Sequence, residues 1–357
     1  MPLTGNKGEW SELYTFVKLL ESGRLYAADE NTNRLNNVYL PILGIEREEE
    51  AGRRIDYTIN SETGVVDIWW GNERINSISN RRISAYADYL YREIINGSNR
   101  AFPIDRADEI MQDLRCYKLA APATDKTDIT MQLHDIYTGF NPVCGFSIKS
   151  ELGNPPTLLN ASKATNFIYE VHELSQWDME RINAIDTRNK ILDRIEAICN
   201  IGTMTYAGMN NDTFRYNLML VDGCMERIIA DMLFCSYRYN ENSCQRALQY
   251  VIRDNPFQVP DQNFYRIKFK RFLYSVALGM MPSKKWDGRD EANGGYIIVK
   301  ENGDVVTYHT HNRNYFEDYL YANTRFERAS TSRHEFASLY MVNGRMYINL
   351  NLQIRFI

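Results

Sequence analysis

The chain has 357 residues, of which 44% are hydrophobic and 24% are charged, so its composition is that of a globular protein and not of a disordered one. Its formal net charge of -5 excludes the overall positive charge of many nucleic-acid-binding proteins, so a nucleic-acid interface would need local clusters of Lys and Arg. The six cysteines form no Cys-x-x-Cys pair, and no apolar run reaches the ~20 residues of a membrane helix. We therefore expect a reduced cytoplasmic protein without disulfides, a zinc site or membrane contact.

The first predicted element is an amphipathic helix over residues 9–21. Trp10, Leu13 and other apolar residues recur at nearly 3.6-residue intervals, and Gly23 follows as a stop signal. After a region of short strands, the pattern predicts a second helix over residues 82–95.

Residues 127–150 have the alternating pattern of an antiparallel hairpin. In its second strand Phe146 and its alternate neighbours form an apolar face, while Ser147 and Lys149 lie on the opposite face. Asp128 opens the first strand. Its side chain lies on the same face as that of Lys149 only if the residue numbers of directly paired residues in the two strands add to an odd total, such as 277. We expect the odd register.

Asp135 also belongs to this hairpin but precedes its turn. It would lie about 20 Å of strand away from Lys149, at ~3.3 Å per residue. We therefore expect Asp135 to cap the turn and not to join a site with Lys149.

Residues 160–255 have a mostly helical pattern, and prolines near residues 255–261 indicate a boundary. We therefore predict two domains, over residues 1–255 and 256–357. The second begins with a basic segment that contains Lys268 and Lys270. Two Asn-Gly pairs, at residues 302–303 and 343–344, then predict two β-hairpins.

Metal-dependent phosphodiester hydrolysis needs carboxylates for the cation, a group that orients water, and positive charge near the phosphate. Asp128 and Lys149 offer these groups on one hairpin. A weaker alternative is an HNH-type nuclease, because His309 and His311 lie in a strand-strand-helix pattern, although the predicted helix lacks the later metal-binding His.

Several motifs spread over nearly the whole chain carry a resemblance to a known family. They are NKGEWSELY (6–14), TDI (127–129), GFSIKSELG (145–153), TLLNAS (157–162), GGYIIVKENGDVVTYHTHNRNYFEDYL (294–320), SRHEF (332–336) and LNLQIRF (350–356). The hairpin motifs resemble the PD-(D/E)XK nuclease core, and together the motifs resemble the HpaII family of type II restriction endonucleases.

The resemblance implies a fold, an activity and partners. The fold would be α/β (α+β), with a restriction-endonuclease-like core whose mixed central sheet is flanked by helices and with a C-terminal region rich in β-hairpins. Residues 1–255 would form the catalytic domain with helical insertions and residues 256–357 the DNA-recognition region. The enzyme would cut double-stranded DNA at CCGG with Mg²⁺ and leave 5′-phosphate ends. A bacterial host and a cognate DNA methyltransferase are also implied, and the oligomeric state, monomer or homodimer, stays open.

The chain departs from the usual core at one catalytic position. Ser147 stands where an Asp or Glu normally precedes the lysine by two residues, so another carboxylate should complete the metal site beside Asp128. Glu12 is the preferred candidate, because Gly8–Glu12 resembles the helix-borne acid of such nucleases. The alternatives are Glu9, Glu151 and Glu170. The missing acid also leaves open a catalytically impaired, nuclease-like DNA-binding protein.

Base recognition is expected from arginines, because a guanidinium can bond both O6 and N7 of guanine. The candidates for DNA contact are Arg313, Arg325, Arg328, Arg333, Lys268 and Lys270. Nearby acids such as Glu317 and Glu327 offer the alternative of intramolecular ion pairs.

Overall fold

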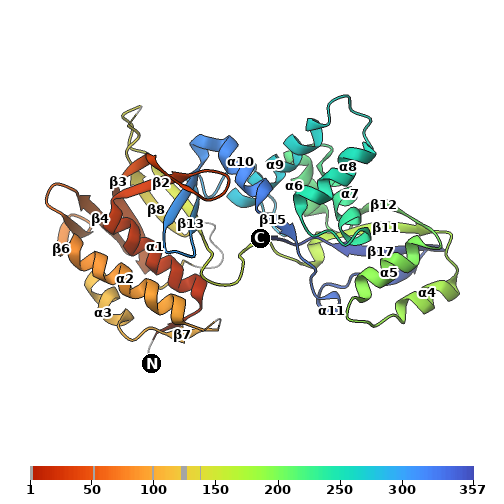
Figure 1. The fold of residues 1–357 in the computed structure, drawn as a ribbon, viewed down its shortest axis with the longest axis horizontal. Helices are drawn as coiled ribbons and strands as arrows, with labels where there is room; N and C mark the ends of the chain where they lie inside the picture. The colour runs from red at the N-terminus through yellow and green to blue at the C-terminus, as the bar shows by residue number, and fades with distance from the viewer. Residues whose placement is uncertain (1–2, 51–52, 99, 122–126, 137) are drawn as a thin grey trace. The chain divides into compact units, whose positions relative to one another are not determined.

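The computed structural model describes residues 3–50, 53–98, 100–121, 127–136 and 138–357 (Figure 1). The chain divides into two compact units, each with its own core. Unit 1 runs to Pro156 and takes in Asp290–Tyr319, while unit 2 comprises Thr157–Arg289 and Leu320–Ile357.

Unit 1 is built around a large mixed β-sheet. The strands of unit 1 are β1 (Thr4–Gly5), β2 (Arg24–Ala28), β3 (Arg34–Glu50), β4 (Arg53–Asn60), β5 (Val65–Trp70), β6 (Glu73–Ser79), β7 (Phe102–Pro103), β8 (Ile129–Leu133), β9 (Val143–Ser150), β13 (Gly295–Val299) and β14 (Val305–His309). Strands β1 and β7 form a separate two-stranded sheet. The main sheet has the order β2-β14-β13-β9-β8-β3-β4-β5-β6. Strand β3 is long enough to pair with β2 along its first part and with β8 and β4 along its second. The strands from β2 to β3 therefore close into a barrel.

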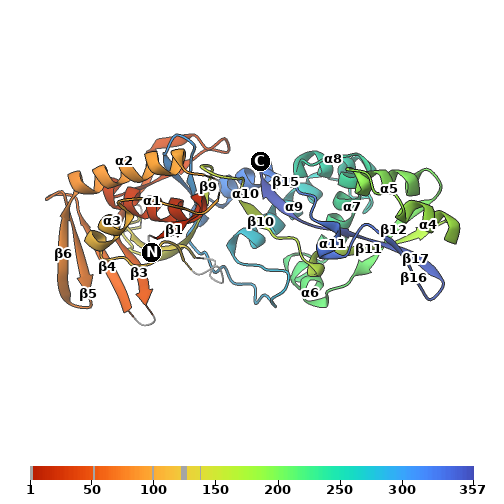
Figure 2. The same ribbon diagram turned by 90° about the horizontal axis from the view of Figure 1, so that it is seen from below.

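Helices cover the apolar side of this sheet. They are α1 (Lys7–Ser22), α2 (Asn80–Asn96) and α3 (Ala107–Leu114). The 3₁₀ helix η2 (Thr310–Asn312) and α10 (Arg313–Ala322) follow β14, and Phe316 of α10 packs on Tyr296 and Tyr308. Figure 2 shows α2 running alongside α1. The predicted first helix is confirmed: Asn6 and Glu9 form a capping box at its start, and Gly23 ends it with a left-handed φ of 58°. Its face with Trp10 and Leu13 is fully buried.

The predicted hairpin at residues 127–150 is confirmed as β8 and β9. Ile129 pairs with Phe146 and Met131 with Cys144, so the paired numbers add to an odd total, as expected. The total is 275 and not 277, because 129 and 146 add to 275. Asp128 therefore lies beside Ser147, and Lys149 follows one side-chain repeat later on the same face.

Unit 2 combines two small sheets with several helices. Its strands are β10 (Thr157–Leu159), β11 (Asn166–His172), β12 (Thr203–Met209), β15 (Thr324–Phe326), β16 (Leu339–Val342), β17 (Arg345–Asn351) and β18 (Ile354–Phe356). Its helices are η1 (Lys163–Thr165), α4 (Gln176–Asn183), α5 (Lys190–Cys199), α6 (Asp212–Val221), α7 (Met225–Arg238), α8 (Cys244–Asp254), α9 (Asn263–Leu278) and α11 (Thr331–His334). An antiparallel sheet has the order β12-β11-β17-β16, and a smaller one the order β10-β18-β15.

The structure is a mixed α/β fold, and two expectations about its layout differ from it. The mostly helical pattern of residues 160–255 also contains β11 and β12, which are held by pairing with each other and with β17. The predicted boundary after residue 255 lies between α8 and α9, inside unit 2. The hairpin of β13 and β14 joins unit 1, because β13 pairs in parallel with β9.

None of the helices in the described part of the chain is both long and apolar enough to cross a membrane.

Candidate active site

Asp128 is fixed at the entrance to β8 by backbone contacts with β9. Its backbone N–H donates to the Phe146 carbonyl at 2.8 Å. Its carboxylate Oδ2 accepts the Ile148 backbone N–H at 2.6 Å and the Ser147 hydroxyl at 3.0 Å. These donors hold the side chain in one orientation and satisfy Oδ2, while no hydrogen bond from the described residues reaches Oδ1. One carboxylate oxygen is thus left for a ligand.

Lys149 lies within the same hydrogen-bonded group. Its Nζ donates to the Ser147 hydroxyl at 2.8 Å and lies 5.0 Å from the centre of the Tyr296 ring. Burial lowers the pKa of Lys149, and the negative charges of Asp128 and Glu12 oppose this effect. The ammonium group is therefore held in a dehydrated pocket beside carboxylates.

Ser147 links the lysine to the aspartate. It is only 5% exposed, accepts from Lys149 and donates to Asp128, so its hydroxyl forms a bridge between the two charged groups. This arrangement gives the residue a positioning role. The sequence predicted Ser147 as a member of the site, but its bonds could be seen only once the register was known.

Glu12 projects from α1 toward the same group of charges. Its Oε2 accepts the Ala121 backbone N–H at 2.9 Å. Burial, and secondly the charge of Asp128, raise the pKa of Glu12 from 4.5 to about 7, while Arg47 and Lys149 act in the opposite direction. Glu12 and Asp128 are therefore two carboxylates that repel each other in a poorly hydrated place, which is the situation that a bound cation relieves.

A buried ion pair behind Glu12 was not predicted from the sequence. Glu49 is 1% exposed and bonds Arg47 at 2.6 Å. Its other oxygen accepts the backbone N–H groups of Tyr117 and Lys118 at 2.7 and 2.9 Å. The pair thus anchors the segment that ends at Ala121, the donor to Glu12. No local pattern indicates such a role, because the partners are about 70 residues apart in sequence.

Tyr296 was also not singled out in the sequence. It pairs with Ser147 across β13 and β9, which places its ring beside Lys149. Burial raises the pKa of its hydroxyl, and the charge of Asp128 adds to that effect. Tyr296 therefore forms an apolar wall of the site.

The alternative acids have other partners. Glu9 belongs to the capping box of α1 and accepts the Asn6 backbone N–H at 2.7 Å. Burial raises the pKa of Glu151, which accepts the Glu301 backbone N–H. Glu170 lies in unit 2, where it pairs with Arg345 at 3.5 Å. The charge of Asp128, in contrast, contributes to the raised pKa of Glu12.

Asp135 caps the turn between β8 and β9, as expected. Its carboxylate accepts the Thr138 hydroxyl at 2.7 Å, and its carbonyl accepts the Gly139 N–H at 2.8 Å. Among the described residues, no group of three or more His, Cys, Asp and Glu side chains is arranged to hold a metal ion.

Comparison with known proteins identifies the family. The model of the HpaII restriction endonuclease family matches residues 6–356. The chain belongs to this family. It is 39% identical over 359 residues to the type II restriction enzyme HpaII of Haemophilus parainfluenzae, with 99% of each chain covered. No solved structure matches the chain. As a member of the HpaII family it is a type II site-specific deoxyribonuclease, and DNA is its substrate.

The two histidines of the HNH-type alternative, His309 and His311, lie next to each other at the end of β14 and in η2, with ring centres 4.7 Å apart. His309 is 6% exposed, and its Nδ1 accepts the His311 backbone N–H at 3.0 Å, so it caps η2. Burial, and secondly His311, lower the pKa of His309 to about 4. The side chain is therefore neutral at physiological pH.

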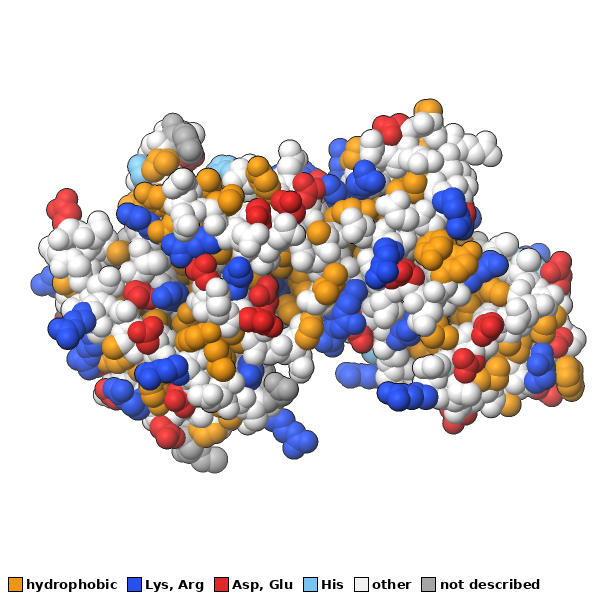
Figure 3. Space-filling view, in the orientation of Figure 1, with side chains coloured by type: hydrophobic (Ala, Val, Ile, Leu, Met, Phe, Trp, Pro, Cys, Tyr) orange, Lys and Arg blue, Asp and Glu red, His pale blue; other side chains and the backbone are white. Residues whose placement is uncertain are grey.

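Most of the predicted DNA-binding side chains have partners within the protein. Arg313 bonds Glu317 at 2.7 Å, and Arg325 pairs with Glu327 at 3.1 Å. Arg328 donates to Asn240 at 2.8 Å. Lys and Arg are interspersed with Asp and Glu over the face in Figure 3, so that face carries no broad basic patch.

The two predicted lysines lie on α9. Lys268 forms an ion pair with Asp222 and lies over the Phe264 ring at 4.5 Å. Lys270 lies 5.5 Å from the centre of the Tyr321 ring. Arg333 is exposed on α11, and no carboxylate partner is seen for it in the described part of the chain. Arg333 is therefore the predicted DNA contact with the fewest competing interactions.

Proposed function

We propose that this enzyme hydrolyses double-stranded DNA at CCGG in a PD-(D/E)XK-type centre formed by Asp128, Glu12, Ser147 and Lys149. The observation that carries the proposal is the chain of hydrogen bonds from Lys149 through Ser147 to Asp128, next to a Glu12 whose pKa is raised by Asp128. The CCGG site and the 5′-phosphate products follow from the family resemblance described above.

The donor set fits a hard divalent cation such as Mg²⁺. Asp128 Oδ1 and the Glu12 carboxylate are oxygen ligands of the kind that Mg²⁺ prefers, and their mutual repulsion favours a cation between them. When bound there, Mg²⁺ would supply Lewis acidity toward the scissile phosphate and favour deprotonation of the attacking water.

The protein groups have separate roles in this proposal. The Lys149 ammonium contributes positive charge to the phosphate and orients the attacking water, and its dehydrated setting strengthens both interactions. Ser147 holds Lys149 and Asp128 in a fixed relation, in place of the acid that usually occupies its position. Glu12 replaces that missing carboxylate from α1.

The test is cleavage of a plasmid that carries CCGG sites, with Mg²⁺ and with EDTA. The native enzyme should give discrete fragments only with Mg²⁺, and Asp128→Asn and Lys149→Ala should give none while still retarding DNA. Asp135→Asn is a matched control, because its carboxylate caps the β8–β9 turn. Normal cleavage by the Lys149→Ala enzyme would refute the assignment.

The same assay separates the other candidate functions. Retarded but intact DNA in the presence of Mg²⁺ would indicate a DNA-binding protein without activity. Loss of cleavage in His309→Ala together with normal cleavage in Asp128→Asn would indicate an HNH-type centre. Digestion of a duplex with one CCGG site and of near-cognate duplexes tests the recognition sequence.

Base recognition is proposed for the predicted cationic side chains, with Arg333 as the first to test. Its replacement by Ala should relax discrimination between CCGG and near-cognate sites, because a bidentate guanine contact contributes about 1–3 kcal/mol. Arg328→Ala is the comparison, since Arg328 is bonded to Asn240. Unchanged discrimination in Arg333→Ala would remove this residue from the proposal.

A further inference from the structure

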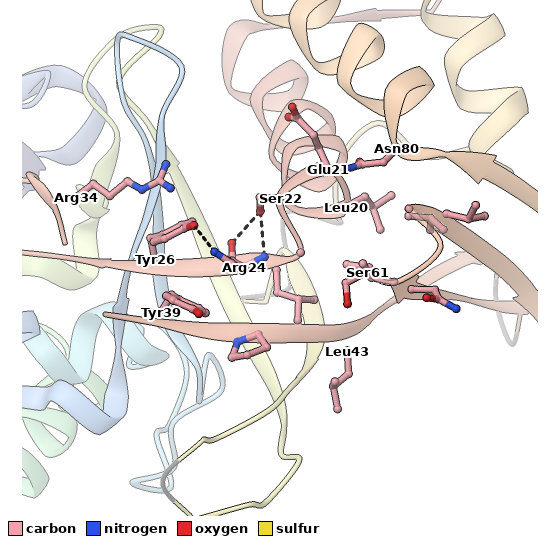
Figure 4. A pocket seen from close by; sticks show the side chains of 18 residues that line it. Leu20, Glu21, Ser22, Arg24, Tyr26, Arg34, Tyr39, Leu43, Ser61 and Asn80 are labelled. Carbon is pink, nitrogen blue, oxygen red and sulfur yellow. Dashed lines mark hydrogen bonds between the residues drawn. The ribbon is translucent and has the colours of Figure 1, made fainter. Parts of the chain in front are cut away.

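A pocket of about 530 Å³ lies in unit 1, between the end of α1, strands β2 and β3, and the turn from β4 to β5 (Figure 4). Its polar lining includes Arg24, Tyr26, Arg34, Tyr39, Asn60 and Asn80. The exposed side chains of Ser22 and Arg24 open it to solvent. None of these residues belongs to the candidate active site.

Two arginines and two tyrosines interleave along the wall of this pocket. Tyr26 and Tyr39 are paired across β2 and β3, with ring centres 5.4 Å apart. The Arg34 guanidinium lies 3.5 Å from the centre of the Tyr26 ring, and the Arg24 guanidinium lies 4.6 Å from that of Tyr39. Contacts of this kind hold the flat guanidinium groups in place against the tyrosine rings.

The charge of the pocket is positive where it meets solvent. Arg24 is exposed and bonds the Tyr26 hydroxyl at 3.4 Å, and no carboxylate partner is seen for it among the described residues. Arg34 is paired with Asp304 at 3.0 Å. The acid in the lining, Glu21, is neutralised by Lys18 at 2.7 Å. Arg24 therefore gives the pocket an uncompensated positive charge.

Neutral hydrogen-bond donors line the opposite side. The Asn60 Oδ1 atom accepts the backbone N–H groups of Glu62 and Thr63 at 3.1 and 3.0 Å, which turns its amide N–H₂ away from that turn. Asn80 contributes a second amide at the start of α2. A cationic edge facing neutral donors suits a phosphodiester group with its sugar.

We propose that this pocket is a second DNA-contact site, which binds the phosphodiester backbone of the duplex outside the recognition sequence. The proposal rests on DNA as the family's substrate and is independent of the assignment of Asp128 and Lys149. Glu12 and Glu21 are nine residues apart on α1, or about 13 Å at ~1.5 Å per residue. The contact should therefore lie about four base pairs or more from the scissile phosphate, at ~3.4 Å per base pair.

The test is the affinity of Arg24→Ala for duplexes of different length, measured by fluorescence anisotropy in EDTA so that no cleavage occurs. On a duplex of about 30 base pairs, the variant should bind about 3- to 10-fold more weakly than the native enzyme, and the slope of log affinity against log salt should fall by about one. On a cross-linked duplex of about 5 base pairs, the two proteins should bind equally, because such a duplex barely exceeds the recognition site and does not extend more than about four base pairs from the scissile phosphate.

Arg92→Ala is the matched control, since Arg92 is exposed on α2 and bonds the Asp88 carbonyl of its own helix. Tyr26→Phe keeps the ring and removes the hydroxyl, so it should give a smaller loss that is again confined to the long duplex. Equal binding of Arg24→Ala and native enzyme to the long duplex would overturn the proposal. An equal loss on both duplexes would also overturn it, as would a loss of the same size in Arg92→Ala.

Because EDTA prevents cleavage, failure here is distinguishable from failure of the proposed catalytic centre. An inactive Asp128→Asn enzyme that keeps the length-dependent affinity for DNA would support the proposed DNA contact at this pocket. The proposal would also be overturned if a free mononucleotide bound the native enzyme but not Arg24→Ala, and if duplex length had no effect on the difference in DNA affinity between the two proteins. That result would identify a small-molecule site.

Discussion

Replacement of Glu12 by Gln should stabilise the metal-free protein at alkaline pH and abolish cleavage. Folding raises the pKa of Glu12 from 4.5 to about 7, because the side chain is buried near Asp128. At ~1.36 kcal/mol for each pH unit, this shift corresponds to about 3 kcal/mol. The native protein loses that stability as the pH rises from 4.5 through about 7, since the ionised carboxylate is favoured in the unfolded chain. A Gln side chain has no such penalty and can still accept the Ala121 N–H.

The measurement is urea unfolding of both proteins in EDTA. Near pH 4.5, where Glu12 is largely protonated in the folded state, the two should be similarly stable. Near pH 8.5, Glu12→Gln should be more stable by up to about 3 kcal/mol. Addition of Mg²⁺ at that pH should raise the stability of the native protein more than that of the variant. A difference that is the same at both pH values, or a less stable variant at alkaline pH, would refute the argument.

Three further predictions concern the groups around the site. Glu49→Ala should lower the free energy of unfolding by about 3–5 kcal/mol in urea, because it leaves the Arg47 charge and two backbone N–H groups buried without their acceptor. Its control, Glu46→Ala, should cost at most about 1 kcal/mol, since Glu46 pairs with an exposed Arg54, and equal losses would contradict the buried-pair argument. Gly145→Ala should lower the free energy of unfolding by about 1–3 kcal/mol and slow plasmid cleavage, because its Cβ would lie 2.7 Å from the side chain of Thr127, next to Asp128. An unchanged unfolding midpoint and cleavage rate would contradict this prediction, since they would show that the segment around Thr127 can shift to make room. His309→Ala should lower the thermal midpoint but leave the metal requirement of cleavage unchanged, whereas an altered metal requirement would assign His309 to the site.

Local patterns predicted much of the secondary structure near the site. The 3.6-residue spacing and Gly23 defined α1, and two Asn-Gly turns located the hairpins of β13–β14 and β16–β17. The alternation in β9 predicted the odd register with β8, because a shift by one residue would reverse its two faces. This rule could not predict the exact pairing, in which the numbers of paired residues add to 275. A shift of the register by two residues keeps the same side chains on the same face, so alternation alone does not distinguish 275 from 277.

Long-range pairing explains the parts that were not predicted. β11 and β12 lie within a mostly helical region and are stabilised by strands far along the chain, including β17. For the same reason, the chain joins β13 and β14 to unit 1 although they follow most of unit 2 in sequence. Local patterns predict pairing between strands that follow each other in the chain, but not pairing between strands as far apart as β9 and β13.

The sequence by itself determined the family of this enzyme. It also indicated the candidate catalytic pair, because Asp128 and Lys149 lie on one hairpin whose geometry is local. Only the tertiary structure decided that Ser147 bridges them and that the charge of Asp128 contributes to the raised pKa of Glu12. Those relations depend on packing between α1, β9 and the segment anchored by Glu49. Burial sets the charges of these groups, and burial is a property of the folded chain as a whole.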